Sequence, residues 1–433
     1  MRYDAFVAAA RQTPYWWEAT PRPDFRQAAV PERVDVAIAG SGYAGLAAAI
    51  ILARRGRHVV VLEAQRIGAG ASTRNTGMLG PSFPKKTASQ LAARHGRRKA
   101  DAILKECLAA QDYCLDFIRR EGIECSLAQV GRFRGALNAR TYEQLGRHAD
   151  ALQTRFGCRA HLVPRGEQHA EVGTDLYHGG LVLEDDYSLD PARYHQGLLT
   201  RAIAAGAVIV EGVPVTAISR DGPTFAVRTP RHTVSARHLI VATNAYTGHA
   251  TPYLQRRVIP IQSSVIVTGP LRRQMMDRLL PKRRMVEEAR RIFYYYRPTP
   301  DGTRIMFGGR SVRSDESSVE NSTDLYAGLV RIFPEIDGVQ VEYAWSGKVA
   351  YTFDYLPHLG MVEGMHYALG CCGSGIAKAT WLGTKIALAV LNDPAQHSAF
   401  QDITFQTRPL YFGMPWFVRP LVIWHQFLDR LGI

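Results

Sequence analysis

The most regular pattern of hydrophobic and polar residues lies between residues 34 and 63. Residues 34–40 (VDVAIAG) are β-branched or small side chains for the most part, as expected for a parallel strand buried on both faces. After a glycine-rich turn comes LAAAIILARRG (46–56), an apolar stretch of helix-forming residues, and then a second β-branched run, HVVVLE (58–63). The pattern predicts a strand, a glycine turn, a helix and a second strand.

The turn between the first strand and the helix reads Gly40-Ser-Gly42-Tyr-Ala-Gly45. Gly40 permits a tight turn, Gly42 lets a pyrophosphate approach the backbone, and Gly45 allows the helix to pack closely on the strand. The helix N-terminus offers unpaired N–H groups and a positive dipole end to the phosphates. Glu63, at the end of the second strand, is placed to accept hydrogen bonds from ribose hydroxyls. Together these features predict a dinucleotide-binding site.

A glycine-rich loop, IGAGASTRNTG (67–77), follows where a nicotinamide dehydrogenase would continue with regular strand–helix pairs. With this loop the sequence resembles the FAD-dependent amine and amino-acid oxidoreductases of the D-amino-acid oxidase and glycine oxidase superfamily. It is nearest in pattern to the gamma-glutamylputrescine oxidoreductase-like members. The resemblance covers residues 30–395 and is carried further by an apolar strand at 235–248, a hairpin at 294–310 and a return to the flavin domain at 344–391.

The resemblance implies an α/β fold in which two domains are interleaved. One is a Rossmann-type FAD-binding domain, and the other is an α+β substrate-binding domain with a mixed sheet. The expected ranges are 1–30 for an N-terminal extension, 31–85, 170–250 and 345–395 for the FAD-binding domain, 86–169 and 251–344 for the substrate-binding domain, and 396–433 for a C-terminal aromatic tail.

The resemblance also implies one molecule of FAD, bound without a covalent link. The segment before Asp354, KVAYT (348–352), has no cysteine for attachment, and the pair Cys371-Cys372 in a glycine-rich turn is more typical of small buried residues. A helix after this turn would direct its N-terminus at the flavin ring. The residues expected to contact FAD are Gly40, Ser41, Gly42, Tyr43, Ala44, Gly45, Glu63, Ala64, Gly70, Ala71, Ser72, Arg74, Asn75, Gly77, Thr243, Asn244, Gly370, Gly373, Ser374, Gly375 and Ile376.

Substrate contacts are expected from the predicted hairpin. Alternation along a strand points Tyr295 and Arg297 to one face, and Tyr294 and Tyr296 then point to the other. Tyr295 would supply a wall with a hydroxyl group, and Arg297 a carboxylate clamp. Aromatic packing under the sheet is the alternative, since strands favour tyrosine. Lys378 is a second candidate for a carboxylate contact, whereas the sequence indicates no catalytic base, triad or metal site.

The reaction implied by the resemblance is dehydrogenation of the C–N bond of an amine or an N-substituted amino acid. Hydride passes to the flavin, and the resulting imine is hydrolysed. The strand at 304–307 (RIMF) has no lysine to activate oxygen, so the acceptor that reoxidises the flavin is oxygen or another molecule. A flavin-dependent monooxygenase and a non-catalytic flavin-binding subunit are the alternatives.

Composition places the chain among globular proteins, with 433 residues of which 46% are hydrophobic and 21% charged. Its net charge of +14 favours anionic partners. However, the basic residues occur as scattered pairs without a nucleic-acid-binding motif, so we expect no nucleic acid. The six cysteines form no C-x-x-C pair, which fits reduced thiols. The chain has no signal-peptide pattern and no apolar stretch long enough to span a bilayer, so we expect a cytoplasmic protein.

The C-terminal segment 409–433 lies outside the resemblance and is rich in aromatic residues. Together with the basic segment 271–291 it could contact an anionic membrane surface. The alternative is that it packs against the FAD-binding domain or a second subunit. We expect packing, because exposed aromatic patches of that size are rare on soluble monomers. The sequence gives no oligomeric state. The aromatic residues concerned are Tyr411, Phe412, Trp416, Phe417, Trp424 and Phe427.

Overall fold

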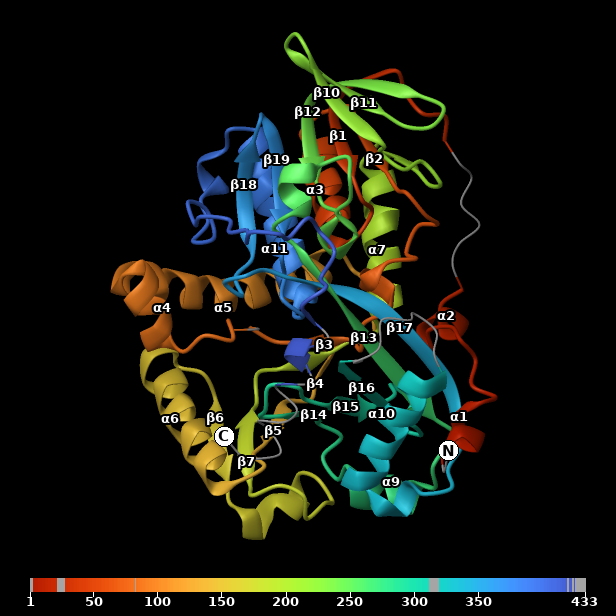
Figure 1. The fold of residues 1–433 in the computed structure, drawn as a ribbon, viewed down its shortest axis with the longest axis vertical. Coiled ribbons are helices and arrows are strands. Elements are labelled where there is room, and N and C mark those ends of the chain that lie inside the picture. Colours follow the sequence, from red (N-terminus) through yellow and green to blue (C-terminus); the bar gives the residue numbers. More distant parts are fainter. Residues whose placement is uncertain are drawn as a thin grey trace.

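Two large β-sheets form the framework of the computed structural model of the chain (Figure 1). Each sheet has eight strands, and a third sheet has three. Figure 1 shows the first sheet in the upper half of the molecule and the second sheet in the lower half. The structure describes residues 3–21, 28–81, 83–310, 319–418, 420–422 and 424.

The first sheet is built around four parallel strands, β1 (Arg33–Ala39), β2 (Val59–Leu62), β9 (Val208–Val210) and β12 (Thr233–Val241). β1 lies between β2 and β12, and β9 pairs with the far side of β2. Val36 and Ile38 of β1 are buried on one face of the sheet, and Ala37 is buried on the other, in the cluster that also contains Phe225. Burial on both faces explains why this strand reads as a continuous apolar run.

Four more strands extend the first sheet as two antiparallel pairs. One pair is β10 (Ala217–Asp221) with β11 (Thr224–Arg228), and the other is β18 (His358–Val362) with β19 (Met365–Leu369). β11 pairs with the first half of β12, and β19 pairs with its last two residues in parallel. The end of β12 therefore lies beside the strand that leads into the last long helix.

Helices cover the Val36 face of the first sheet, namely α3 (Tyr43–Arg54), α5 (Arg97–Arg120), α7 (Pro191–Ala204) and α11 (Gly375–Val390). α7 begins as predicted, because the Asp190 side chain accepts hydrogen bonds from the backbone N–H groups of Ala192 and Arg193, and Pro191 occupies the first turn. α11 packs directly on α3, where the backbones meet at Gly383. A β-carbon on this glycine would lie 2.2 Å from the carbonyl oxygen of Ala44.

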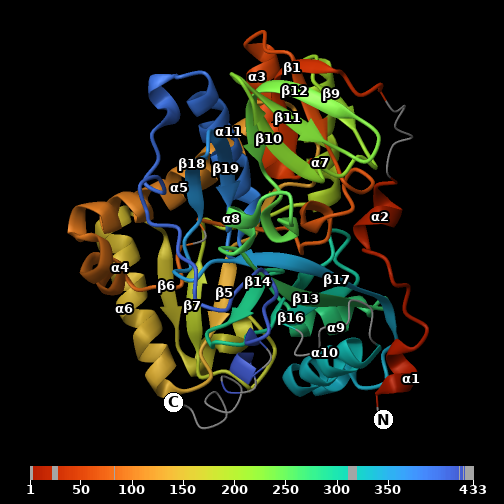
Figure 2. The ribbon, with the colours of Figure 1, turned by 45° about the horizontal axis from the view of Figure 1, so that its top comes forward.

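The second sheet runs in the order β17 (Val341–Tyr351), β13 (Ile259–Thr268), β16 (Ile305–Arg310), β15 (Tyr295–Pro298), β14 (Met285–Glu288), β5 (Arg132–Gly135), β7 (Gly180–Leu183) and β6 (Ala160–Val163). Its neighbours are antiparallel except for β14 and β5. β15 and β16 form the predicted hairpin, with Gly302 in its turn at a φ of +70°. β17 and β13 lie nearest the first sheet (Figure 2).

The helices on the second sheet are α1 (Asp4–Val7), α6 (Ala139–Phe156), α9 (Arg273–Leu279) and α10 (Val319–Ile332), while α4 (Ala88–His95) packs beside α5. α5 contributes its apolar side to the core of the first sheet, although its residues fall in the range expected for the substrate-binding domain. The division into two domains at the expected boundaries stays a prediction.

Both ends of the described chain lie against the second sheet. Trp16, in α2 (Trp16–Ala19), is fully buried beside Val265 and Trp345. Near the other end Tyr411 is buried on the second sheet, beside Ile259 of β13, and not on the first sheet that carries the FAD-binding motif, while Phe412 and Trp416 are exposed. The C-terminal segment is therefore buried at some aromatic residues and exposed at others. Phe427 lies outside the described residues.

Within the described ranges, no helix has the length and apolar character needed to cross a membrane.

Candidate active site

The glycine turn between β1 and α3 has the close contacts that its sequence predicts. Gly40 has a φ of +101°, a left-handed conformation that favours glycine. A β-carbon on Gly45 would lie 1.9 Å from the carbonyl oxygen of Gly40, so no larger residue fits where helix and strand cross. Gly42 is the N-cap residue of α3 and brings no capping side chain. The Ser72 hydroxyl accepts from the first backbone N–H of the helix, that of Tyr43, at 3.2 Å. The positive end of the helix dipole lies at the adjoining cavity, which Gly42, Tyr43 and Ala44 line.

Glu63 follows β2 and is held in a fixed position beside this turn. Its Oε2 accepts hydrogen bonds from the backbone N–H of Ser41 at 2.9 Å and from the Ser41 hydroxyl at 2.7 Å. Its Oε1 accepts from the backbone N–H of Gln65 at 3.0 Å. Each carboxylate oxygen has further acceptor capacity, so a ribose hydroxyl can still donate to Glu63.

A long cavity of about 410 Å³ starts at the glycine turn and passes η3 (Asn244–Tyr246) at the end of β12. This lining fits a dinucleotide, because its pyrophosphate would meet backbone N–H groups and its ribose a fixed carboxylate. The predicted cofactor residues that line the cavity are Gly40, Ser41, Gly42, Tyr43, Ala44, Glu63, Ala64, Gly70, Ala71, Ser72, Thr243 and Asn244.

A second cavity of about 230 Å³ lies between the end of the first and the faces of β13 and β17. The two cavities share six lining residues. The N-terminal turn of α11 lies along the second cavity and is approached through Gly373, whose φ is +92°. Four predicted cofactor residues in that turn, Gly373, Ser374, Gly375 and Ile376, line this cavity, as do Arg74 and Asn75. The shared residues are Tyr43, Ala71, Ser72, Asn244, Cys371 and Ala379.

Three predicted cofactor residues line neither cavity but hold neighbouring backbones together. Gly45 packs α3 on β1, as described above. A β-carbon on Gly77 would lie 2.0 Å from the carbonyl oxygen of Leu189, and one on Gly370 would lie 2.4 Å from Cγ2 of Thr352. Gly370 also donates its N–H to the Asn244 side chain at 2.9 Å, which ties the end of β12 to the turn before α11.

Side-chain hydrogen bonds hold the loop at 70–77, which contains η1 (Ala71–Thr73). The Asn75 amide nitrogen donates to the carbonyls of Ala71 and Ser72 at 3.1 Å each, and its oxygen accepts from the Gly77 N–H at 2.9 Å. Arg74 donates to the carbonyls of Ala69 and Ser346, so it bridges the loop to β17. The loop thus presents a fixed surface to both cavities.

Two tryptophans from the N-terminal segment support the same loop, and sequence reasoning missed both. Trp16 donates its indole N–H to the carbonyl of Asn75, and Trp17 donates to the Thr73 hydroxyl, each at 2.9 Å. His195 of α7 was missed as well. Its Nε2 lies 2.8 Å from the carbonyl oxygen of Ser41, which can only accept, and burial lowers its pKa, so it is a neutral donor. No local sequence pattern links these residues to the glycine motif.

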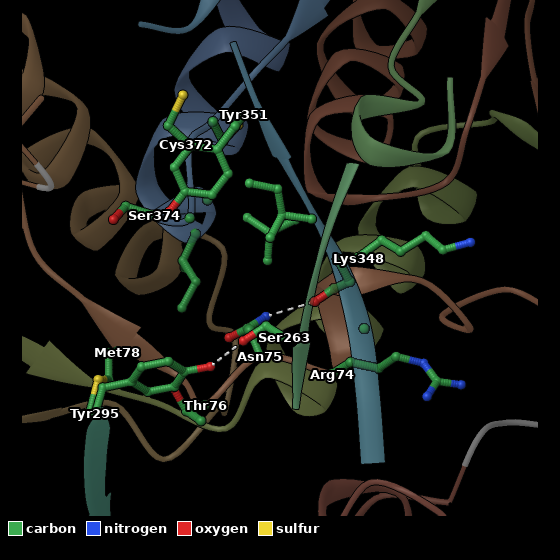
Figure 3. A pocket seen from close by; sticks show the side chains of 18 of the residues that line it. Arg74, Asn75, Thr76, Met78, Ser263, Tyr295, Lys348, Tyr351, Cys372 and Ser374 are labelled. Atoms are coloured by element: carbon green, nitrogen blue, oxygen red, sulfur yellow. Dashed lines mark hydrogen bonds between the residues drawn. The ribbon is translucent and has the colours of Figure 1, made fainter. Parts of the chain in front are cut away.

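The structure brings Tyr295 to the second cavity, where its hydroxyl lies 2.9 Å from the Ser263 hydroxyl. Figure 3 shows Tyr295 near Met78, with Tyr351, Cys372 and Ser374 at the opposite end of the pocket. The predicted alternation is confirmed for Tyr296, which is fully buried in the core on the other face of the strand.

Arg297 does not reach the cavity, which corrects its predicted placement at the substrate. The side chain is 5% exposed, and its guanidinium donates to the carbonyls of Pro298, Thr76, Gly77 and Leu189. Burial lowers its pKa to about 10. Since its Nε and Nη1 donors face backbone carbonyls, Arg297 fastens β15 to the loop at 70–77.

Lys378 is likewise absent from the lining of either cavity. It is 3% exposed on the first turn of α11, close enough to Cys107 and Cys371 for its charge to oppose the rise in their thiol pKa values. The prediction placed it toward the substrate. The observed burial follows from its position in the α11 sequence, where Ile376 and Ala379 take the cavity side instead.

Arg310, at the end of β16, is the cation that sequence reasoning overlooked. It lines the second cavity, and one of its terminal nitrogens donates to the Tyr351 hydroxyl at 2.6 Å. That hydroxyl would lie 3.0 Å from a β-carbon on Gly373, which places it beside the turn before α11. Lys85 also lines the cavity. The residue as a whole is exposed, and its ammonium group lies 4.9 Å from the ring centre of Phe293 and 5.0 Å from that of Tyr351.

Other charges in the cavity wall pair with one another. Arg132 lies 2.7 Å from Asp186 and 2.8 Å from Glu287, and Arg134 lies 2.7 Å from Glu287. Burial raises the pKa of Asp186 to about 6. In Figure 3 the side chains of Arg74 and Lys348 extend away from Tyr295 and Tyr351. Arg310 and Lys85 therefore give the second cavity its cationic character.

A cavity that fits a dinucleotide, next to a cationic and aromatic chamber, is suited to a redox cofactor placed against an anionic substrate. The family model described as DAO, FAD dependent oxidoreductase, matches residues 35–388 of the chain. The protein therefore belongs to this family of FAD-dependent oxidoreductases, which confirms the resemblance, the cofactor and the enzyme class predicted from the sequence.

Individual relatives agree with the family. The chain is 29% identical to gamma-glutamylputrescine oxidoreductase of Escherichia coli, over 92% of this chain and 93% of the relative. It is 28% identical to the probable oxidoreductase OrdL of Haemophilus influenzae, over 86% of each. The crystal structure of glycine oxidase from Geobacillus kaustophilus is similar, with a TM-score of 0.71 and 22% identity over 88% of this chain and 99% of that chain. This likeness confirms the α/β fold class.

Proposed function

We propose that the protein oxidises the C–N bond of an amine or amino acid that carries a carboxylate. The observation behind this proposal is the junction of the two cavities, where a flavin ring held by the first would form one wall of the second. The names of the relatives, which include a gamma-glutamylputrescine oxidoreductase and a glycine oxidase, support an amine or amino-acid substrate. When bound, FAD supplies the hydride acceptor.

Arg310 binds the substrate carboxylate in this proposal. Within the part of the chain that the structure describes, its guanidinium donates to the Tyr351 hydroxyl through one nitrogen, and the other donors can bind a planar anion. Lys85 adds a second positive charge at the same wall. Tyr295 and Tyr351 enclose the carbon chain of the substrate and exclude water from the reacting carbon. This arrangement would hold the C–N bond against the junction of the cavities.

The N-terminal turn of α11 is proposed to stabilise the negative charge that develops when the cofactor is reduced. The side chain of the N-cap residue Ser374 makes no capping hydrogen bond. The first N–H groups of the helix and its positive dipole end therefore face the cavity. The substrate amine must be neutral to lose a hydride, and the imine product is then released to water for hydrolysis. Oxygen or another acceptor completes the cycle.

Non-covalent attachment of FAD is supported by the state of the nearby thiols. Burial raises the pKa of Cys371 to about 12, and it raises that of Cys372 as well, so both thiols remain protonated at neutral pH and are poor nucleophiles. Acid precipitation should release the flavin into the supernatant, whereas colour retained in the washed pellet would contradict this.

All six cysteines are free, which supports a reducing compartment such as the cytoplasm.

The experiment that tests the proposed function is steady-state turnover of the holoprotein with amines and amino acids, in air and with an artificial acceptor. The expected products are a carbonyl compound and the released ammonia or amine. Oxygenated product with consumption of a reduced nicotinamide would assign a monooxygenase instead. Flavin that no amine reduces would assign a non-catalytic flavin-binding subunit.

A further inference from the structure

An exposed apolar surface, which we call the aromatic face, lies on the C-terminal segment. The exposed fractions of its side chains run from 40% to 76%. Trp416 donates its indole N–H to the carbonyl of Leu410 at 3.3 Å, so these two residues belong to one structured turn. Exposed apolar patches of this kind mark contact surfaces. The aromatic face comprises Leu410, Phe412, Met414, Trp416, Leu421 and Trp424.

Tyr411 and the residues just before the segment are anchored, which directs these side chains outward. Tyr411 is 2% exposed and donates its hydroxyl to the carbonyl of Val258 at 2.6 Å. Thr407 donates to the carbonyl of Arg256 at 2.6 Å, and Arg257 donates to the carbonyl of Phe405 at 2.8 Å. Since these inward positions are occupied, Phe412 and its neighbours cannot turn inward without breaking the anchors.

Two arginines lie beside the described part of this segment. The sequence has no acidic residue between Asp402 and Asp429. The Arg256 guanidinium lies 4.9 Å from the ring centre of Phe412, and that of Arg408 lies 5.3 Å from the ring centre of Phe353. The aromatic face therefore has a cationic rim, on a chain whose net charge is +14.

The aromatic face also lies close to the substrate cavity. Phe417, on the anchored side of the segment, packs with the cluster that contains Ile261, Val349 and Tyr351. All three of these residues line the second cavity. One layer of side chains thus separates the segment from the cavity wall.

We propose that the aromatic face seats the protein on an anionic membrane surface. Tryptophan, phenylalanine and leucine side chains enter the boundary between headgroups and acyl chains, and arginines at the rim pair with anionic headgroups. The protein lies on the membrane and does not span it. In this orientation the wall of the substrate cavity lies beside the headgroup layer.

A second copy of the chain fits the same surface less well. A symmetric contact through this face would bring Arg256 and Arg408 against their counterparts, and like charges in a desolvated contact repel each other. An anionic surface turns the same arginines into attractive contacts. Charge complementarity therefore favours an anionic membrane over a second copy of the chain as the partner of the aromatic face.

The test is flotation of the full-length holoprotein with two kinds of vesicle, pure phosphatidylcholine and an equal mixture of phosphatidylcholine and phosphatidylglycerol. We expect binding about tenfold stronger to the mixed vesicles, weakened by salt. The triple variant Phe412→Ser, Met414→Ser and Trp416→Ser should lose about tenfold in binding while it retains FAD. The matched control is Ile203→Ser with Met361→Ser, because these side chains are 45% and 64% exposed on α7 and β18, and it should bind as the wild type does.

Three results would overturn the proposal. The wild-type protein could fail to float with the anionic vesicles. The triple variant could float as well as the wild type, which would assign binding to diffuse positive charge. Light scattering could show a dimer that the triple variant dissociates, which would assign the aromatic face to a second copy of the chain.

Discussion

Two arginines of one hairpin, Arg297 and Arg310, have different surroundings, and local pattern could not separate them. Both are strand residues, and alternation predicts Arg297 on the face that Tyr295 also occupies. The sequence pattern does not predict that the carbonyls of Leu189 and Thr76 lie within reach of the Arg297 guanidinium and accept its hydrogen bonds. Arg310 donates to Tyr351, which lies on β17. Its role therefore depends on a tertiary contact that the spacing of residues along the chain does not predict.

The Arg310→Gln variant should bind carboxylate-bearing substrate more weakly. A hydrogen bond to a charged group contributes about 1.5–3 kcal/mol, so KM should rise by about tenfold to a hundredfold while FAD content stays the same. Arg310→Lys should recover part of the loss. Arg237→Gln removes a solvent-exposed arginine and should leave KM unchanged. An unchanged KM in Arg310→Gln would show that the carboxylate is bound elsewhere.

Lys85 predicts a pH dependence of substrate binding. Burial of its ammonium group, with Arg310 nearby, lowers the pKa of Lys85 to about 7. The group is charged below this pKa and neutral above it, so its attraction for a carboxylate is present at acidic pH and lost as the pH rises. KM should therefore increase by about threefold to fivefold across pH 7, the effect of a partly solvated charge pair. The same profile measured with Lys85→Met should lack this step, since titration of the substrate is common to both proteins.

At the scale of elements, the best predicted part is the β1–α3–β2 unit. Each of its signals is local, since the apolar run, the glycines and the closing glutamate follow one another within a single unit. The hairpin of β15 and β16 was also predictable, because its turn glycine adopts a positive φ. The support of the flavin loop by α2 was not predictable, because Trp16 lies far from Asn75 in the sequence.

The two N-terminal tryptophans should contribute to FAD affinity through the loop they support. Replacement of Trp16 and Trp17 by phenylalanine removes two indole donors and leaves the aromatic packing largely in place. Each hydrogen bond contributes about 0.5–1.5 kcal/mol, so the Kd for FAD should rise by about tenfold in the double variant. Trp381→Phe is the matched control, because its indole donates to Glu106, away from the loop. Equal FAD affinity in all three proteins would refute the role of the N-terminal segment.

At the scale of the whole molecule, the site depends on how the first sheet's helices meet. The N-termini of α3 and α11 both reach the junction of the cavities because the helices touch at Gly383 and Ala44. This convergence could be expected only through the family resemblance, since the two helices are more than three hundred residues apart in the chain.

Replacement of Gly383 by valine should therefore disturb both stability and cofactor binding. The added side chain collides with the α3 backbone, and overpacking of this kind costs about 1–3 kcal/mol. Denaturant unfolding should show the loss, and equilibrium dialysis should show weaker FAD binding. Gly166→Ala, at a glycine with open space around its β-carbon position, should change neither. Unfolding that matches the wild type would mean that α11 can shift without cost.

The central claim is that this flavoprotein takes hydride from an amine that carries a carboxylate. The most direct measurement is anaerobic titration of the holoenzyme with a panel of amines, amino acids and their hydroxy-acid analogues, followed by flavin absorbance. The account predicts that at least one carboxylate-bearing amine bleaches the flavin, that its hydroxy analogue does not, and that Arg310→Gln needs a higher concentration for the same bleaching. Flavin that stays oxidised with every amine, or that is bleached equally well by amines without a carboxylate, would contradict it.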